Sequence, residues 1–501
     1  MSQHFLLTAP IAVPLAFVAL TALLWRMPAL QRAASLAGSL VLLAAALALL
    51  AATADGTILA TQFGSWRAPF GISFVADRLA AAMVLITAIL AVVVSVYQLK
   101  DGETSGQAMF HPLYHGLLLG VAGAFLTGDL FNLYVWFEVM LISSFGLLVL
   151  GGTREQLDAG VKYVTLNLVM TTIFLVSVAL LYGATGTLNM ADLAQKVPLI
   201  ENTGLVSTLA LMFFLAFGSK AALFPLFFWL PASYHTASTP VLAIFAALLT
   251  KVGVYAIVRS FTLIFPMDGA LGWVIALVAG LTMITGVLGA ASHFDVRKIL
   301  SFHIISQIGY MLAGVAIATP LALAGAVFYI VHHIIVKANL FLIGGIIKRR
   351  AGSYDLKRVG GLHRSAPLLA ILFCVPALSL AGLPPLSGFW AKFLVIKPGL
   401  DAGHVYLAAT ALLVGVLTLY SMLKIWNEAF WKDHPEGGQR AVPPQPTGWS
   451  HYLPIVALSL ITLAIGLNPE PFADFSMQAA GQLSDSSGYV NAVLGNDHAP
   501  D

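Results

Sequence analysis

The sequence predicts an all-α polytopic membrane protein of about 14 transmembrane helices, and its composition is the first reason. Of its 501 residues, 59% are hydrophobic and 9% are charged, and the mean hydropathy is +0.90. A soluble domain carries about 25% charged residues, so this composition is typical of a membrane protein. Unbroken apolar runs such as 36–54 and 79–97 are long enough to span a bilayer as helices and lack the alternation of barrel strands.

Apolar runs of spanning length follow one another along most of the chain. They lie at about 5–24, 32–53, 74–97, 111–128, 130–150, 161–183, 205–230, 239–260, 271–291, 299–318, 321–347, 366–396, 403–427 and 452–468. Lys and Arg residues outside these runs concentrate in alternate loops, for example at 348–350, and the positive-inside rule places those loops in the cytoplasm. Both termini are then expected on the external side of a bacterial cell (inner) membrane.

The last part of the chain, residues 431–501, is expected to form a cytoplasmic linker, the fourteenth helix and an external tail. The linker at 432–450 is rich in Pro and Gly. The tail after about residue 468 is polar and acidic, so we expect it to be loosely ordered.

Two of the long apolar runs are interrupted near their middle by proline. Lys220 is followed by Pro225, and Pro384 and Pro385 precede Lys392. Proline cannot donate a backbone hydrogen bond, so each break frees carbonyl groups beside a lysine. The two runs are five spans apart, and this odd offset predicts two inverted five-helix repeats, helices 4–8 and 9–13, with two broken helices at a midplane site. The alternative is that these prolines only kink their helices.

Ionisable side chains inside the apolar runs are the strongest functional signal. They are Glu138, Lys220, Lys251, Lys337 and Lys392. A charge at the bilayer centre costs at least about 2.5–3.5 kcal/mol, so five of them indicate an ion or proton path. Burial favours a neutral lysine and a neighbouring carboxylate favours a charged one, so a Glu138–Lys220 pair could act as a switch that releases a proton to Lys251. A static ion pair that stabilises helix packing is the alternative.

Span eleven adds His333, which lies four residues before Lys337 and shares its helix face. An imidazole titrates near neutral pH and suits a proton relay, whereas a hydrogen-bonded histidine between helices is the alternative. His332 points elsewhere and is expected to be structural, and Lys424 is expected to snorkel to the cytoplasmic surface. Three further polar positions that could hold water are His303, Ser306 and Gln307.

Several kinds of site are not expected from this sequence. The chain has one cysteine, Cys374, and no CxxC pair, Gly-rich phosphate loop or nucleophile elbow. No metal site, cofactor or nucleic-acid partner is expected, and the protein is expected to be a component of a transporter rather than an enzyme.

The stretch at 229–259, WLPASYHTASTPVLAIFAALLTKVGVYAIVR, resembles the signature of the proton-translocating antiporter-like membrane subunits. This family includes large membrane subunits of respiratory complex I, of membrane-bound hydrogenases and of Mrp-type multisubunit Na+/H+ antiporters. The likeness extends to FNLYVWFEVMLISSFGLL, HHIIVKANLFLIGG and GLPPLSGFWAKF, and covers roughly residues 74–427. Within the family it is strongest to the D-type members of Mrp antiporters, which the stretch GSWRAPFGISFVADRLAA and the length near 500 also suit.

The resemblance implies a division of the chain into helices 1–3 (1–110), a proton-translocating core (111–430) and the C-terminal part (431–501). It implies these roles for the ionisable residues: a modulating pair of Glu138 and Lys220, a central relay of Lys251, His333 and Lys337, and Lys392 as the exit group. Gln307 stands where some members carry a histidine, so the central relay is expected to run through water and span eleven. Other antiporter subunits are the implied partners in the lipid bilayer, and Na+ and H+ are the implied transported ions.

Two other functions are open at this point. A proton-pumping membrane subunit of complex I (NADH:quinone oxidoreductase) or of a membrane-bound hydrogenase would use the same residues, driven by electron transfer elsewhere. A scaffold whose charges hold partners together is the third possibility. Since lysines repel Na+ and the sequence offers no cluster of carboxylates, we expect this chain to conduct mainly protons.

Overall fold

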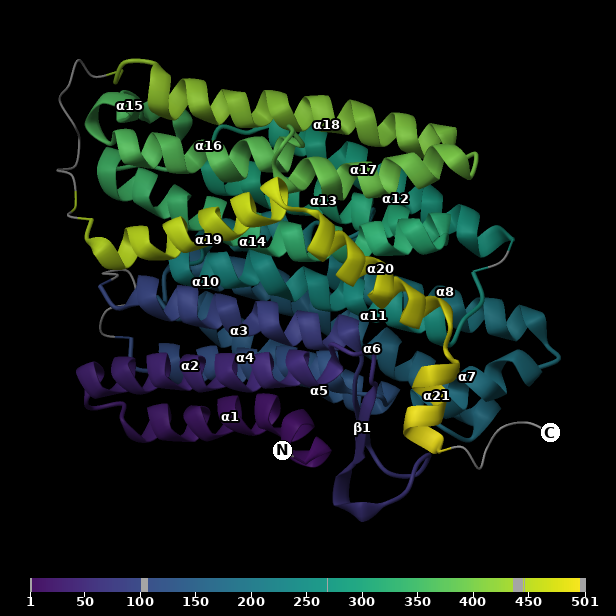
Figure 1. The fold of residues 1–501 in the computed structure, drawn as a ribbon. Helices are drawn as coiled ribbons and strands as arrows, with labels where there is room; N and C mark the ends of the chain where they lie inside the picture. Colours follow the sequence, from purple (N-terminus) through teal and green to yellow (C-terminus); the bar gives the residue numbers. More distant parts are fainter. Residues whose placement is uncertain (1, 101–106, 268, 436–444, 446, 496–501) are drawn as a thin grey trace.

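The computed structural model describes residues 2–100, 107–267, 269–435, 445 and 447–495, and it is almost entirely helical (Figure 1). Its α-helices are α1 (Gln3–Leu23), α2 (Pro28–Thr53), α3 (Arg78–Gln98), α4 (Phe110–Leu126), α5 (Leu130–Val149), α6 (Arg154–Thr185), α7 (Met190–Lys196), α8 (Thr203–Ala221), α9 (Trp229–Ser233), α10 (Thr239–Ile244), α11 (Thr250–Leu263), α12 (Ala270–Ser292), α13 (Val296–Ile317), α14 (Pro320–Ala351), α15 (Leu362–Ser365), α16 (Pro367–Ala381), α17 (Ser387–Asp401), α18 (Val405–Ile425), α19 (Trp449–Leu467), α20 (Glu470–Ser484) and α21 (Ser487–Leu494). The other elements are the 3-10 turns η1 (Phe63–Ser65), η2 (Val197–Leu199), η3 (Tyr234–Thr236) and η5 (Leu356–Arg358), the π-helical segments η4 (Phe245–Leu249) and η6 (Trp426–Trp431), and the strands β1 (Leu59–Gln62) and β2 (Ser73–Ala76).

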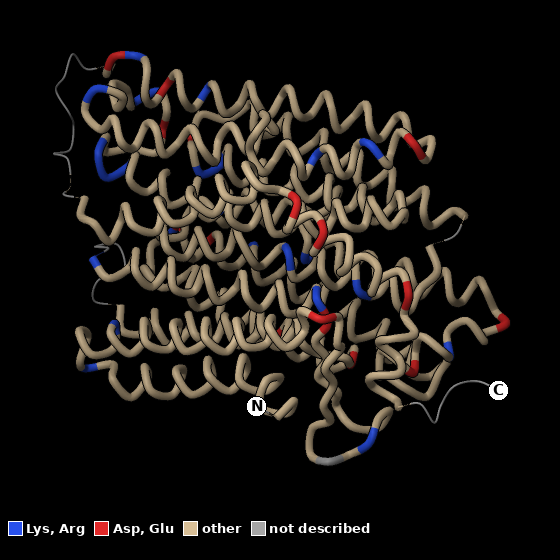
Figure 2. Tube along the Cα trace, in the orientation of Figure 1, with Lys and Arg blue, Asp and Glu red and all other residues tan. Residues whose placement is uncertain are grey.

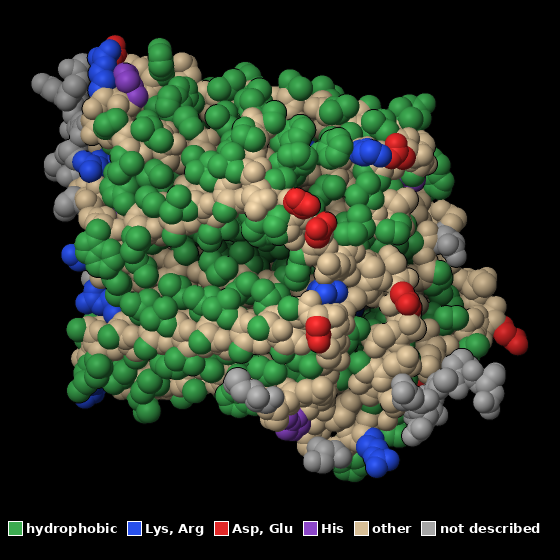
Figure 3. Space-filling model, viewed as in Figure 1, with side chains coloured by type: hydrophobic (Ala, Val, Ile, Leu, Met, Phe, Trp, Pro, Cys, Tyr) green, Lys and Arg blue, Asp and Glu red, His purple; other side chains and the backbone are tan. Residues whose placement is uncertain are grey.

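The all-α membrane architecture is confirmed. Among the described residues, 12 helical segments are long and apolar enough to cross a membrane, and two shorter apolar helices are α4 and α16. The predicted count of 14 spans stays a prediction. Figure 2 shows Lys and Arg gathered at the end of the bundle where α15 and the start of α19 lie, and Figure 3 shows a predominantly hydrophobic lateral surface.

The core of the bundle consists of three spans that the rest of the chain encloses. The segments at 239–263 and 296–317 and the helix α14 are almost completely buried, whereas most other spans expose one face. Helices α1–α3 lie along one end of the row and α18 along the other (Figure 1). The charged side chains in the middle of these spans, Lys251 and Lys337, are therefore shielded from lipid by the protein itself.

The two predicted broken helices are present and have the same local design. Helix α8 ends at Ala221 and α16 ends at Ala381. The cap residues that follow, Ala222 and Gly382, have left-handed backbone angles, with φ of 61° and 92°. In both, the amide of this residue donates to the carbonyls three and four residues back, and the next amide donates five back, which is a Schellman ending. Pro225 and Pro385 each follow three residues later. The matched breaks support the two inverted repeats.

The tail after about residue 468 was expected to be loosely ordered, and this expectation is wrong for its described part. Residues 470–494 form α20 and α21, and α20 packs against α14. The tail has a polar average composition, but Ala479, Ala480 and Leu483 recur at helical spacing and form one buried face. The linker prediction at 432–450 falls largely on residues outside the described part of the chain.

The segment before span three holds a small sheet that the sequence analysis did not predict. Strands β1 and β2 pair antiparallel, from Leu59 opposite Ala76 to Gln62 opposite Ser73. Helix α3 begins at Arg78 rather than at residue 74, because the Asp77 carboxylate accepts a hydrogen bond from the Ala80 amide and caps the helix.

Candidate functional site

Lys251 lies on the enclosed span formed by α10, η4 and α11, and its side chain is fully buried. The π-helical segment η4 immediately precedes it, and the Lys251 Nζ atom donates to the Ala246 carbonyl inside this segment at 2.6 Å. π-Helical turns are rare and frequently accompany functional sites, because their irregular ladder leaves backbone groups for other partners. The irregular turn thus supplies a polar partner for an ammonium in the middle of an apolar bundle.

His333 and Lys337 lie on the enclosed helix α14, and both are fully buried. The Lys337 Nζ atom donates to the Leu300 carbonyl of α13 at 3.1 Å. Lys251 is near enough to interact electrostatically with both His333 and Lys337. The structure therefore brings together the three residues expected to form the central relay, although Lys251 and Lys337 are 86 positions apart in the chain.

Glu138 of α5 and Lys220 of α8 face one another across the first half of the bundle without direct contact. No ion pair within 4 Å joins them in the described part of the chain, although their charges interact. The Lys220 Nζ atom lies 5.6 Å from the centre of the Phe137 ring, and one Glu138 carboxylate oxygen is buried without a hydrogen-bond partner. The two groups therefore interact without direct contact, and the predicted switch stays a prediction.

Lys392 of α17 occupies the break in the second broken helix. Its Nζ atom donates to the freed Ala381 carbonyl at the end of α16 at 2.7 Å, as the proline argument predicts. The same atom lies 5.2 Å from the centre of the Tyr310 ring, and the Lys392 side chain packs directly over Gly382. Tyr310 stacks on Tyr329 with 5.2 Å between ring centres. The break thus places this lysine against helices α13 and α14.

His303 of α13 lies between the central group and Lys392, and the sequence analysis gave it only a water-holding role. It is fully buried, it interacts electrostatically with both Lys337 and Lys392, and neither ring nitrogen has a hydrogen-bond partner. Buried polar atoms are normally hydrogen-bonded to protein or to water, and no protein group fills this role for the two ring nitrogens of His303. Other buried polar side chains in this region with at least one unpartnered atom are Thr250, Ser301, Ser306, Gln307, His332, His333 and Asn339.

Two further polar residues have structural contacts. The His332 Nδ1 atom lies 2.8 Å from the Ser387 hydroxyl, and this hydroxyl lies 3.0 Å from that of Ser379 across the helix break. The Lys424 Nζ atom donates to the carbonyls of Ala290, Ala291 and His293 and so caps the end of α12. The side chain is partly exposed, and its snorkelling to the cytoplasmic surface stays a prediction.

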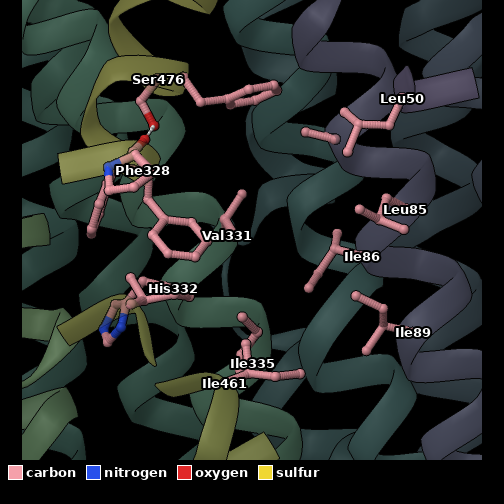
Figure 4. Close-up of a pocket in the computed structure, with 15 residues that line it drawn as sticks. Leu50, Leu85, Ile86, Ile89, Phe328, Val331, His332, Ile335, Ile461 and Ser476 are labelled. Atoms are coloured by element: carbon pink, nitrogen blue, oxygen red, sulfur yellow. Dashed lines mark hydrogen bonds between the residues drawn. The ribbon is translucent and has the colours of Figure 1, made fainter. Parts of the chain in front are cut away.

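Two cavities differ in what they offer an ion. One of about 290 Å³ lies between α2, α3, α14, α19 and α20 and is lined mainly by aliphatic and aromatic side chains (Figure 4). In Figure 4 the His332 ring points away from Leu85, Ile86 and Ile89, and apart from His332 and Ser476 the cavity is lined by apolar side chains. The other, of about 330 Å³, is lined by Lys392 together with exposed residues of α17 and α18, so Lys392 has access to the outside of the chain.

No group of three or more His, Cys, Asp or Glu side chains is placed to hold a metal ion within the described residues. The site is instead a row of titratable side chains, Glu138, Lys220, Lys251, His333, Lys337, His303 and Lys392. Such a row, with water in its gaps, can pass protons across the enclosed core without any covalent chemistry.

Comparison with known proteins identifies the family. A family model described as NADH:quinone oxidoreductase/Mrp antiporter, TM matches residues 127–418, which is more than half of the chain and includes every titratable residue of the row. The chain belongs to this family. It is 49% identical over 435 residues to the D component of the Na(+)/H(+) antiporter of Alkalihalophilus pseudofirmus, covering 86% of this chain and 88% of that protein. It is 41% identical over 435 residues to the D component of the Na(+)/H(+) antiporter of Bacillus subtilis, with the same two coverages. The resemblance to the D-type members is confirmed.

Solved structures agree with the family. The chain is similar to one in the Mrp complex from Dietzia sp. DQ12-45-1b, with 36% identity, a TM-score of 0.90 and coverage of 98% of this chain and 99% of that one. It is also similar to a chain of respiratory complex I from Thermus thermophilus, with 27% identity, a TM-score of 0.82 and coverage of 96% and 99%. The same bundle therefore occurs in antiporter complexes and in redox complexes.

Proposed function

We propose that this chain is the D-type member of a hetero-oligomeric monovalent cation (Na+)/proton antiporter and conducts protons within it. Its relatives at 49% and 41% identity are named as the D components of Na(+)/H(+) antiporters. The protein would lie in a bacterial cell membrane with both termini outside, and residues 111–430 would form the translocating core. It acts in secondary transport, driven by the proton motive force, rather than as an enzyme.

The observation that carries this proposal is the row of titratable side chains, of which Lys251, His303, His333 and Lys337 lie on the three enclosed spans. Polar atoms with no hydrogen-bond partner in the protein lie beside them. Glu138 modulates Lys220, which passes a proton to Lys251, and His333 and Lys337 form the central relay. His303 and water carry the proton on to Lys392, whose cavity gives it an exit. Pro225, Pro384 and Pro385 contribute by opening the helices at the two lysines that lie at the breaks.

The cation route lies mainly outside this chain. Sodium prefers several oxygen ligands, and ammonium groups repel it. The enclosed core contains four lysines and no carboxylate on α10, α11, α13 or α14. Na+ therefore moves through a partner protein of the complex or close to Glu138, and exchange requires the assembled complex.

A second candidate is a proton-pumping membrane component of a redox complex such as complex I, because the fold is shared at a TM-score of 0.82. Its residues would act in the same way, but electron transfer would drive them. The higher identity to the D components of antiporters favours the first function.

The test is Na+-induced proton movement in everted vesicles from antiporter-deficient cells that express the full complex. Lys220→Ala should abolish exchange at unchanged assembly, because it removes the acceptor between Glu138 and Lys251. Lys397→Ala is the matched control, since this lysine is exposed and pairs with Asp401. Retained exchange in Lys220→Ala would overturn the relay. Proton pumping that follows an electron donor, with no response to Na+, would favour the redox complex.

A further inference from the structure

A buried ion pair lies at the external end of the span that carries Lys251. The Arg259 guanidinium of α11 donates to the Asp77 carboxylate at 2.6 Å, and the two side chains are 5% and 1% exposed. Asp77 is also the cap of α3, where its other oxygen accepts from the Ala80 amide. A buried pair is weak evidence for stability, because removing two charges from water offsets much of their attraction.

Lys251, Tyr255 and Arg259 follow one another at intervals of four residues and share one face of α11. Arg259 donates to the Tyr255 hydroxyl at 3.3 Å, and this hydroxyl donates to the Phe125 carbonyl at 2.7 Å. With about 1.5 Å of rise per residue, Arg259 lies about 12 Å from Lys251 along the helix. A polar stripe thus leads from the central relay towards the external side and ends at a guanidinium.

The C-terminal helices cover this end of the stripe. The ring of Tyr489 in α21 lies 5.1 Å from the guanidinium carbon, and Tyr489 is itself buried. Helix α20 is held by Gln482, which accepts from the Arg78 amide and donates to the Gly56 carbonyl. Gln62 of β1 donates to the Val493 carbonyl of α21. The hairpin and the tail together form a lid over the ion pair.

Lys392 and Lys251 therefore differ in their access to the outside of the chain. Lys392 lines a cavity that opens on the outside of the chain, whereas the stripe beyond Lys251 ends at a permanently charged, covered guanidinium. A fixed arginine in a narrow path is an electrostatic barrier to protons and other cations.

We propose that Arg259, held by Asp77 and covered by Tyr489, is an electrostatic seal that prevents protons from passing directly between Lys251 and the external side. The proposal rests on the proton relay proposed above and adds a direction to it. Protons at the centre must continue to Lys392. Without the charge of Arg259, protons could pass between Lys251 and the external side without exchange for Na+. Arg259 is in this sense a positioning residue: it binds no transported ion and restricts where the proton goes.

The experiment uses the complete complex, purified and reconstituted in liposomes, with a potassium diffusion potential and no Na+. Proton influx is followed with an internal pH dye. A unit charge about 12 Å away in a medium of effective dielectric about 20 changes the occupancy of a proton site roughly tenfold. Arg259→Gln is therefore expected to raise the passive proton leak roughly tenfold, and Arg259→Lys, which keeps the charge, is expected to leave it near the original rate.

Lys251→Met distinguishes a seal from damaged packing. The leak of Arg259→Gln should disappear in Arg259→Gln/Lys251→Met, because the leak runs through the relay, whereas a leak through loosened helices would persist. A leak in Arg259→Gln equal to that of the unaltered complex, or one that persists in the double variant, overturns the seal. If Arg259→Gln does not assemble because it leaves the Asp77 carboxylate buried without its partner, Arg259→Gln/Asp77→Asn decides the matter, since it removes both charges and keeps a side chain that can cap α3. A raised leak supports the seal and an unchanged one overturns it.

The single variant Lys251→Met separates this proposal from the proposed function. Exchange that survives in Lys251→Met contradicts the relay itself. Exchange that is lost in Lys251→Met, together with an unchanged leak in Arg259→Gln, contradicts only the seal.

Discussion

The close packing of α11 against α8 allows the spacing of the first two relay lysines to be tested with a single methyl group. Gly253 lies two residues after Lys251, and a Cβ atom on it would be 2.5 Å from the Ala221 amide nitrogen, 2.8 Å from the Lys220 carbonyl carbon and 2.9 Å from the Phe217 carbonyl oxygen. All three atoms belong to backbone, so no side chain can turn aside. This glycine therefore sets how closely the helix of Lys251 approaches the helix of Lys220.

Gly253→Ala should push the two helices apart. Ordinary contact for such an atom begins near 3.4 Å, so the helices must separate by about 0.9 Å, the difference between 3.4 and 2.5 Å. Overpacking of this kind costs about 1–3 kcal/mol. The strain can be relieved by widening the gap between Lys220 and Lys251, which raises the barrier to proton transfer between them. If this barrier rises by about 1.4 kcal/mol, Na+-dependent proton exchange in everted vesicles should slow about tenfold.

The matched control is Gly183→Ala in α6, where a Cβ atom would meet nothing within 4 Å. Assembly is measured for both variants by the amount of complex that survives purification. If Gly253→Ala assembles as well as Gly183→Ala and exchanges at the same rate, the contact of Gly253 with α8 does not control the distance for proton transfer between Lys220 and Lys251.

Three further predictions concern other parts of the chain. Lys424→Met should lower the free energy of unfolding, because the lysine caps α12, and each lost hydrogen bond to the charged amine contributes at most about 1.5–3 kcal/mol. Exchange should continue in this variant, and abolished exchange at full assembly would contradict the capping role. Gly388→Ala should prevent assembly, because its methyl carbon would lie 1.7 Å from the Ser379 carbonyl oxygen, and Gly481→Ala, at an open position, should assemble normally. Burial and two neighbouring basic side chains lower the pKa of His235, which lies in η3 outside the spans. The unfolded chain therefore binds more protons than the folded one below about pH 6.5, so this histidine reduces stability as the pH falls. In thermal unfolding experiments, His235→Gln should lose less stability than the unaltered protein between about pH 6.5 and 5.

The sequence by itself was sufficient for the membrane class and the broken helices, and it singled out most residues of the proposed relay. These depend on local causes: an apolar run must span as a helix, proline must free a carbonyl, and a lysine in such a run is costly wherever it packs. The hydrogen bond from Lys392 to the Ala381 carbonyl is the clearest case, because the proline positions alone predict which carbonyls are free.

The tertiary structure decided which of these groups meet. His303 and Lys424 look equivalent in sequence, as single polar residues in apolar helices. Packing leaves both nitrogens of His303 unpartnered between two relay lysines, whereas it places Lys424 on three carbonyls of another helix. The ion pair of Asp77 and Arg259 joins residues 182 positions apart. Periodicity along one chain cannot predict such contacts, because they depend on how whole helices are arranged around one another, and this arrangement is set by the sum of many small packing interactions.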